Sequence, residues 1–208
     1  MPEKSFPVST ELVRRLRERT GAGIMECRQA LARAGGEIEE AMRLLRAKGA
    51  SLAQEKAGRV ARQGLIGSYV YGGKIGVLVE VNCETDFVAR TEQFRDFVHE
   101  VCLQIASMNP RFIRREDVPP EEVGKELEAL HEEISGVDDE SSQPMQQATM
   151  ERFYRERVLL DQPYVKDPSK TVQDLLHETV NSIRENIVIH RFVRLALGEN
   201  PEAPKTSP

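Results

Sequence analysis

The feature that most constrains this fold is a strict alternation of residue types from Ile75 to Asn82. Isoleucine or valine occupies every second position, so a β-strand here would present one apolar face to a core. A second strand-like run, Leu65 to Tyr71, precedes it, and the Gly72-Gly73 pair between the two is typical of a tight hairpin turn. Such a hairpin is antiparallel, and it needs packed helices to bury its apolar face.

Apolar residues at helical spacing lie on both sides of this hairpin. Before it, we expect three short helices, each ended by glycine, and then an alanine-rich and charged helical connector. After it, we expect a long amphipathic helix, a helical hairpin with a polar turn, one more helix and a final strand. The expected ranges are 10–20, 24–34 and 37–48 for the short helices, 50–62 for the connector, 92–108 for the long helix, 123–134 and 145–160 for the helical hairpin with its turn at 136–144, 171–183 for the next helix, and 187–197 for the strand.

The predicted fold class is therefore α+β, with an antiparallel sheet and packed helices. We expect a three-helix module over residues 1–50, which we call the helical module, and a helical linker over 51–63. The sheet core would span 64–198, with the helical hairpin near 120–160 projecting from it. Residues 199–208 contain three prolines and no periodicity, so we expect a disordered tail there.

Charge changes sign close to the same boundary. Residues 1–62 hold 13 Lys+Arg and 8 Asp+Glu, whereas the remainder holds 16 and 26, which gives the net charge of −5. This asymmetry suggests two modules with different partners, although a solvated arginine-rich surface is the alternative. The acidic remainder would repel phosphates, which argues against broad DNA binding.

Composition and motifs exclude several classes of protein and of site. No apolar run approaches the ~18 residues of a membrane span, and no secretory signal is visible. Three separated cysteines, Cys27, Cys83 and Cys102, indicate free thiols in a reducing cytosol, so we expect a cytoplasmic protein without a disulfide framework. No histidine has a second histidine or cysteine at metal-ligand spacing, and hydrolase and phosphate-loop motifs are missing. We therefore predict a binding protein, with no catalytic residue, metal site or cofactor.

Two local segments carry a family resemblance. They are RTGAGIM at 19–25 and NCETDFVAR at 82–90. Three further blocks are GLIGSY at 64–69, QPYV at 162–165 and ENIVI at 185–189. The first two closely resemble signature segments of bacterial elongation factor Ts, the guanine-nucleotide exchange factor for elongation factor Tu. The other three look like further blocks of the same family, and all five stand in the family's order. This chain resembles the short form, with one core unit where many members carry two. Its departures are Tyr71 for histidine, Ile24 for methionine, Val193 for cysteine and Arg184 for glycine.

The resemblance implies that the protein binds elongation factor Tu–GDP and promotes the exchange of GDP for GTP. Thr85, Asp86, Phe87 and Val88 would carry the exchange activity. In the family, the matching Asp-Phe pair presses on the partner's G domain near its magnesium site, and the phenylalanine inserts as a wedge. A ubiquitin-associated-like helical module would dock on a helix of that domain through Gly23, Ile24 and Met25. Tyr71 would be a secondary contact with the partner's β-domains. The core would also serve dimerisation, as a homodimer or in a two-plus-two complex, with no cofactor, direct nucleic acid or membrane.

The residues alone leave alternatives open at each site. A lone aromatic such as Phe87 is usually a core residue, and Tyr71 could lie in a bare solvent turn. Adjacent helical positions cannot both point into one core, so one of Ile24 and Met25 should lie at the surface, unless both are partly buried. The alternative functions are a ubiquitin-associated-like adaptor and an RNA-binding protein. Neither explains Thr85–Val88, and the only aromatic residue of the helical module is Phe6, too few for base stacking.

Overall fold

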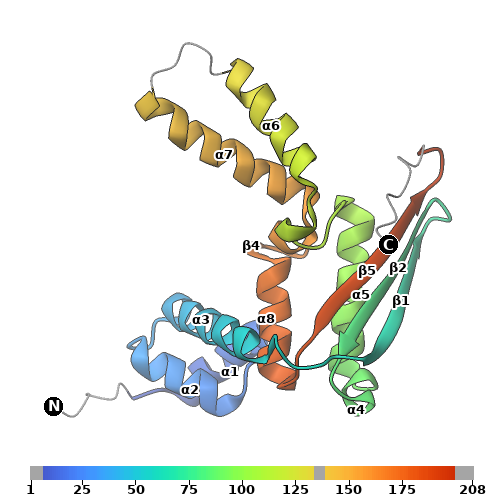
Figure 1. The fold of residues 1–208 in the computed structure, drawn as a ribbon. Coiled ribbons are helices and arrows are strands. Elements are labelled where there is room, and N and C mark those ends of the chain that lie inside the picture. Colours follow the sequence, from blue (N-terminus) through green and yellow to red (C-terminus); the bar gives the residue numbers. More distant parts are fainter. Residues whose placement is uncertain (1–6, 134–138, 200–208) are drawn as a thin grey trace.

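The computed structural model describes residues 7–133 and 139–199. The helical module consists of α1 (Thr10–Thr20), α2 (Ile24–Arg33) and α3 (Ile38–Lys56), as Figure 1 shows. Ser9 caps α1, because its hydroxyl oxygen accepts the Leu12 N–H at 3.2 Å, and Gly21 ends that helix with φ 65°. The three apolar faces meet in a small core of their own: Val13, Leu16, Ala22, Cys27, Ala30, Leu31, Ala41, Met42 and Leu45.

The third helix is longer than the sequence predicts. Gly49 does not end it, and α3 continues through part of the predicted linker to Lys56. A Cβ at Gly49 would lie 3.3 Å from the backbone oxygen of His177 in α8 (Val172–Ile183), so the missing side chain lets the two helices approach closely. The contact between α3 and α8 packs the helical module against the core.

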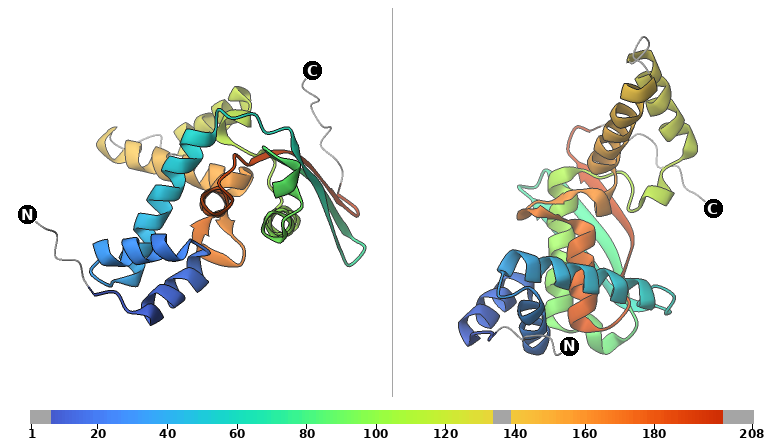
Figure 2. Two further views of the ribbon diagram at one scale, coloured as in Figure 1. Left: turned by 90° about the horizontal axis from the view of Figure 1, so that it is seen from below. Right: turned by 90° about the vertical axis from the view of Figure 1, so that its left-hand side faces the viewer.

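The core is built on one antiparallel sheet with the strand order β1-β2-β5. The strands are β1 (Gln63–Tyr71), β2 (Ile75–Cys83) and β5 (Val188–Ala196), and they confirm the predicted strands to within two residues. Helix α5 (Glu92–Met108) covers one face, where Val77, Val79 and Val81 pack in the main core. Figure 2 shows α5 end-on against this face. The α+β class and the predicted order of elements are confirmed.

The other face of the sheet is apolar and exposed. Register places Ser68, Leu78 and Val193 in one row across the three strands, and Val70, Gly76 and Leu195 in the next. The large apolar side chains of these rows are exposed, as is that of Ile66. No helix of the described residues packs on this side (Figure 1).

A helical hairpin of α6 (Pro120–Glu133) and α7 (Asp139–Arg157) projects from the core, as expected (Figure 1). The prediction of a polar turn through residue 144 is wrong from 139 onward, where α7 already begins. Residues such as glutamate and glutamine have good helix propensity, so a polar composition alone does not exclude a helix. The rest of the predicted turn, and the predicted tail beyond Glu199, lie outside the described residues.

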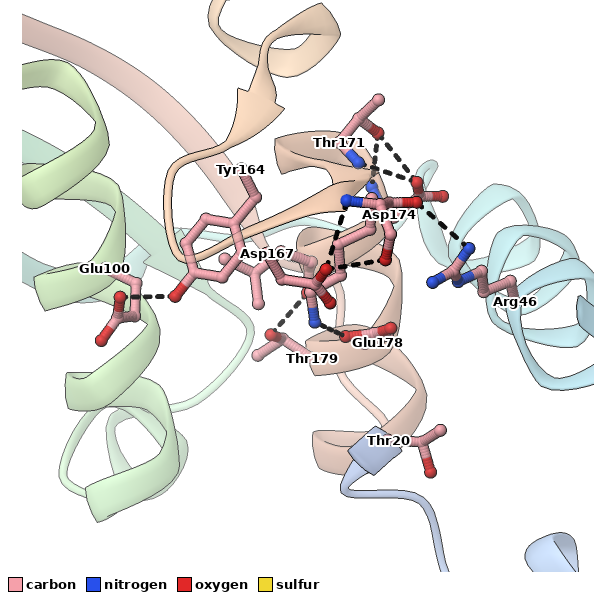
Figure 3. A network of polar contacts seen from close by, with 12 residues as sticks. Thr20, Arg46, Glu100, Tyr164, Asp167, Thr171, Asp174, Glu178 and Thr179 are labelled. Atoms are coloured by element: carbon pink, nitrogen blue, oxygen red, sulfur yellow. Dashed lines mark hydrogen bonds and ion pairs between the residues drawn. The ribbon is translucent and has the colours of Figure 1, made fainter. Parts of the chain in front are cut away.

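A small hairpin of β3 (Pro163–Tyr164) and β4 (Asp167–Thr171) was not predicted from the sequence. Figure 3 shows the polar contacts that hold it in place. The Tyr164 hydroxyl donates to Glu100 of α5 at 2.5 Å, and Lys170 Nζ donates to Glu178 of α8 at 2.7 Å. Arg46 of α3 donates to the Ser169 carbonyl at 3.5 Å. The hairpin therefore links the helical module to two helices of the core.

Candidate partner-binding site

A single helical turn, α4 (Asp86–Ala89), follows β2 and presents Phe87 to solvent. Thr85 caps it, since its Oγ1 accepts the Val88 N–H at 3.3 Å. Phe87 is 76% exposed, whereas Val88 is only 6% exposed and belongs to the main core. The core alternative for Phe87 is therefore wrong. Val88, which was predicted as a contact together with Phe87, is buried in the main core and anchors the turn.

The turn is held by a carboxylate about a hundred residues away in the sequence. Glu185 Oε2 accepts the backbone N–H groups of Glu84 and Thr85 at 3.1 and 3.0 Å, and its Oε1 accepts the Thr85 hydroxyl at 2.7 Å. Glu84 returns the contact, because its Oε1 accepts the Asn186 N–H at 2.7 Å. The α4 turn is thus fixed before any partner arrives.

Cys83 supports the same turn from the core. Its thiol donates to the Thr85 carbonyl at 3.1 Å, and the side chain is fully buried. Burial, with the nearby Glu185 carboxylate as the second cause, raises the pKa of this thiol to about 11. The sulfur therefore stays protonated near neutral pH and remains a hydrogen-bond donor.

Gly23, Ile24 and Met25 form the start of α2. Ile24 is 55% exposed and Met25 is 62% exposed, so the structure leaves both at the surface. We expected one of the two at the surface, or both partly buried, and both are exposed. The buried face begins at Cys27, because the first turn of α2 extends beyond the small core of the helical module. A groove of about 450 Å³ runs beside this turn, between α1, α2 and α8.

Glu26 lies behind the exposed pair and is largely enclosed. Its side chain is 12% exposed and accepts from Lys48 Nζ at 2.6 Å, from Asn181 Nδ2 at 3.2 Å and from the Arg184 guanidinium. Burial opposes its ionisation, but these hydrogen bonds outweigh it and hold the pKa of the carboxyl below its usual range. Glu26 is therefore an ionised anchor between the helical module and α8.

Tyr71 is exposed at the tip of the β1–β2 hairpin. Gly72 and Gly73 have φ of 55° and 67°, and the Lys74 N–H donates to the Tyr71 carbonyl at 3.0 Å, which makes a tight hairpin turn. Figure 1 shows α4 and the helical module toward one end of the molecule and this tip at the other. The structure thus brings two of the predicted contacts to one end and leaves Tyr71 apart.

Sequence reasoning missed the residues that hold the site. Glu26, Asn181 and Glu185 touch segments that lie far away along the chain, and only the resemblance of the block at 185–189 marked part of this region. The described residues hold no group of three His, Cys, Asp or Glu side chains arranged for a metal ion, and the three cysteines are buried free thiols. None of the helices in the described part of the chain is long and apolar enough to cross a membrane.

Comparison with known proteins shows the family of this chain. Residues 8–199 match the family described as Elongation factor TS. The chain belongs to the elongation factor Ts family. It is 51% identical to elongation factor Ts of Thermoanaerobacter sp. over 94% of the chain and 97% of that protein. It is also 51% identical to elongation factor Ts of Caldanaerobacter subterraneus subsp. tengcongensis, over 94% of the chain and 99% of that protein.

Family membership confirms the resemblance and assigns the chain to the translation elongation factors. The match extends from the helical module through α4 to the end of β5. A ubiquitin-associated-like adaptor would be favoured if only the helical module were recognisable, and the match extends far beyond that module.

Proposed function

We propose that this protein is a guanine-nucleotide exchange factor that binds elongation factor Tu–GDP and promotes the release of GDP and its replacement by GTP. The observation that carries the proposal is the exposed Phe87 on a turn fixed by Glu185 and Thr85. An aromatic ring left in water on a rigid base has the properties of an interface anchor, because the ordering cost has already been met during folding.

The proposed mechanism needs no covalent chemistry and no cofactor of this chain. The α4 turn presses on the G domain of elongation factor Tu near its bound magnesium ion, with Phe87 inserted between partner side chains. Magnesium offsets the charge of the phosphates, so disturbing that site weakens the hold on GDP. By linkage, an exchange factor that weakens GDP binding must itself bind more weakly to the GDP-bound partner.

Two further contacts complete the proposed interface. Gly23, Ile24 and Met25 dock on a helix of the same G domain, and the exposure of both large side chains supports this role. Tyr71 makes a secondary contact with the partner's β-domains from the opposite end of the sheet. No direct contact with nucleic acid or membrane is part of the proposal.

The open face of the sheet supports a homodimer, and with it a two-plus-two complex with elongation factor Tu. Leu78 and Val193 lie side by side on this face, and Gly76, which has no side chain, lies between Val70 and Leu195. Two copies related by a two-fold axis would bury these side chains face to face. Light scattering should report a dimer for the protein and a monomer for Leu78→Lys, and a monomeric wild type would reject this part.

The test of function is complex formation with purified bacterial elongation factor Tu on a sizing column. We expect a stable complex without nucleotide, its dissociation by excess GDP, and no effect of nuclease. An adaptor would keep its partner in the presence of GDP, and an RNA-binding protein would lose it on nuclease treatment. Either of those results would contradict the proposal.

A further inference from the structure

The connection between α8 and β5 contacts both surfaces proposed above. Three consecutive residues of this connection, Arg184, Glu185 and Asn186, each reach a different distant segment. Arg184 pairs with Glu26 beside Met25, Glu185 accepts from the cap of α4, and Asn186 Nδ2 donates to the Arg59 carbonyl at 2.7 Å in the segment after α3. One tripeptide therefore touches the helical module, the Phe87 turn and the link between module and sheet.

We propose that residues 184–186 are a positioning element, which fixes the Gly23–Met25 surface relative to Phe87 so that both engage the partner as one rigid surface. This inference rests on the proposed exchange function, but its structural part can be tested without the partner. Neither Arg184 nor Glu185 has to touch elongation factor Tu for the proposal to hold.

The backbone at Arg184 is the first argument. Arg184 ends α8 in the left-handed region, with φ 67° and ψ 19°, a position that favours glycine. Among the described residues the only other non-glycine with positive φ is Asn109, and asparagine tolerates this region well. An arginine there carries conformational strain, and such strain points to a role for the side chain. The contact that glycine could not make is the one to Glu26.

The surroundings of Glu26 are the second argument. Its carboxylate receives Lys48 from the helical module and both Asn181 and Arg184 from the end of α8. Because Glu26 follows Met25 directly, these bonds set the direction of the exposed first turn of α2. The Arg184 side chain is 49% exposed, so the ion pair adds little to folding stability. Its effect is on orientation.

The Glu185 and Asn186 contacts are the third argument. Glu185 accepts three donors from Glu84 and Thr85, and Asn186 both donates its N–H to Glu84 and holds the Arg59 carbonyl. The tripeptide is therefore attached at several points that do not lie on one segment, which restrains rotation of the helical module about the core. Two binding surfaces held in register avoid the entropic cost of orienting the second one after the first has bound.

The central experiment uses Arg184→Gly in the full chain. Glycine adopts φ 67° without strain, so the melting temperature should stay level or rise. The concentration of this protein that gives half-maximal GDP release from elongation factor Tu should rise about fivefold or more, the lower range of ordinary coupling effects. The maximal rate should stay within about twofold of wild type, because Glu185 still holds the Phe87 turn. Arg184→Lys, which keeps the cation, should recover part of the loss.

The matched control is Arg43→Ala, which removes an arginine that pairs with Glu40 inside α3 and links no two modules. It should leave both kinetic parameters near wild type. Met25→Ala then tests the coupling: it should raise the half-maximal concentration in the wild-type background and raise it less when combined with Arg184→Gly. An equal fold-increase from Met25→Ala in both backgrounds would overturn the proposal.

A partner-free measurement separates this proposal from the proposed function. Spin labels at Arg33→Cys in α2 and Arg95→Cys in α5, both exposed positions, report the distance between module and core. We expect a narrow distance distribution in the otherwise unchanged protein and a broad one with Arg184→Gly. An unchanged distribution would overturn the positioning role, and a broadened one with unchanged exchange kinetics would overturn its importance for the partner. Failure of the wild type to accelerate GDP release would reject the proposed function, while the distances would still decide the positioning role.

Discussion

Replacing Phe87 with alanine separates an interface anchor from a core residue. The ring is 76% exposed, so of the about 200 Å² that an enclosed phenylalanine buries, only about 50 Å² is buried in the free protein. At about 25 cal/mol per Å², this area contributes about 1.2 kcal/mol to the free energy of unfolding. Alanine offsets about 0.5 kcal/mol of that loss through its better helix propensity in α4. The melting temperature should therefore fall by no more than about 4 °C.

The complex should respond far more strongly. Covering the remaining area of about 150 Å² against the partner corresponds to about 4 kcal/mol at the same coefficient, which is an upper limit. We expect a loss of at least about 2 kcal/mol, or roughly 30-fold in the rate of GDP release at a fixed concentration. The assays are thermal melting and fluorescent-GDP release on one purified variant.

The neighbouring residue is the control for this prediction. Val88 lies in the same turn but is 6% exposed, so Val88→Ala should cost about 2 kcal/mol of folding stability. Val88→Ala should thus lower the melting temperature more than Phe87→Ala does, whereas Phe87→Ala should slow GDP release more than Val88→Ala does. A large melting shift for Phe87→Ala, or GDP release as fast as that of wild type, would refute the wedge.

Three further predictions follow from the same contacts. Glu185→Gln should lower the maximal rate of GDP release about tenfold or more, because one amide oxygen cannot replace a carboxylate that accepts three donors; an unchanged maximal rate in stopped-flow assays would contradict this. Tyr71→Ala should weaken binding to elongation factor Tu more than twofold in calorimetry if the hairpin tip is a contact, and a smaller change would leave it a bare turn. Burial raises the pKa of Cys83 and Cys102 to about 11 from an ordinary 9.0. The stability that these two protonated thiols contribute should therefore be fully present below pH 9 and be lost as the pH rises toward 11. The urea midpoint of Cys102→Ala should decline less steeply over this range than that of wild type, and parallel curves would contradict the assignment.

Local patterns in the sequence predicted the elements of this fold well. The alternation from Ile75 to Asn82 needs only neighbouring residues to be recognised, and the same is true of the apolar stripe of α5. The helix end predicted at Gly49 is wrong because a glycine that ends a helix and one that permits close helix packing look alike in sequence. The difference lies in α8, which follows more than a hundred residues later.

The candidate site was only half accessible to sequence reasoning. The resemblance marked Thr85–Val88, but the exposure of Phe87 depends on which side chain of a single turn faces the core, and a turn of four residues has no period to reveal it. The exposure of both Ile24 and Met25 has a related reason, since the helical pattern continues past the edge of the small core of the helical module. The contacts of Glu185 and Arg184 join segments 100 and 158 residues apart, which no local pattern encodes.

The most direct test of the central claim is stopped-flow release of fluorescent GDP from bacterial elongation factor Tu over a range of concentrations of this protein. We predict that the rate rises hyperbolically and reaches at least about 100-fold over the spontaneous rate, which corresponds to about 2.7 kcal/mol of barrier lowering. The rise should be nearly flat over the same range for Phe87→Ala. A rate that stays at the spontaneous value at every concentration, while the two proteins still form a complex, would show that the exposed turn binds without promoting exchange and would contradict the account.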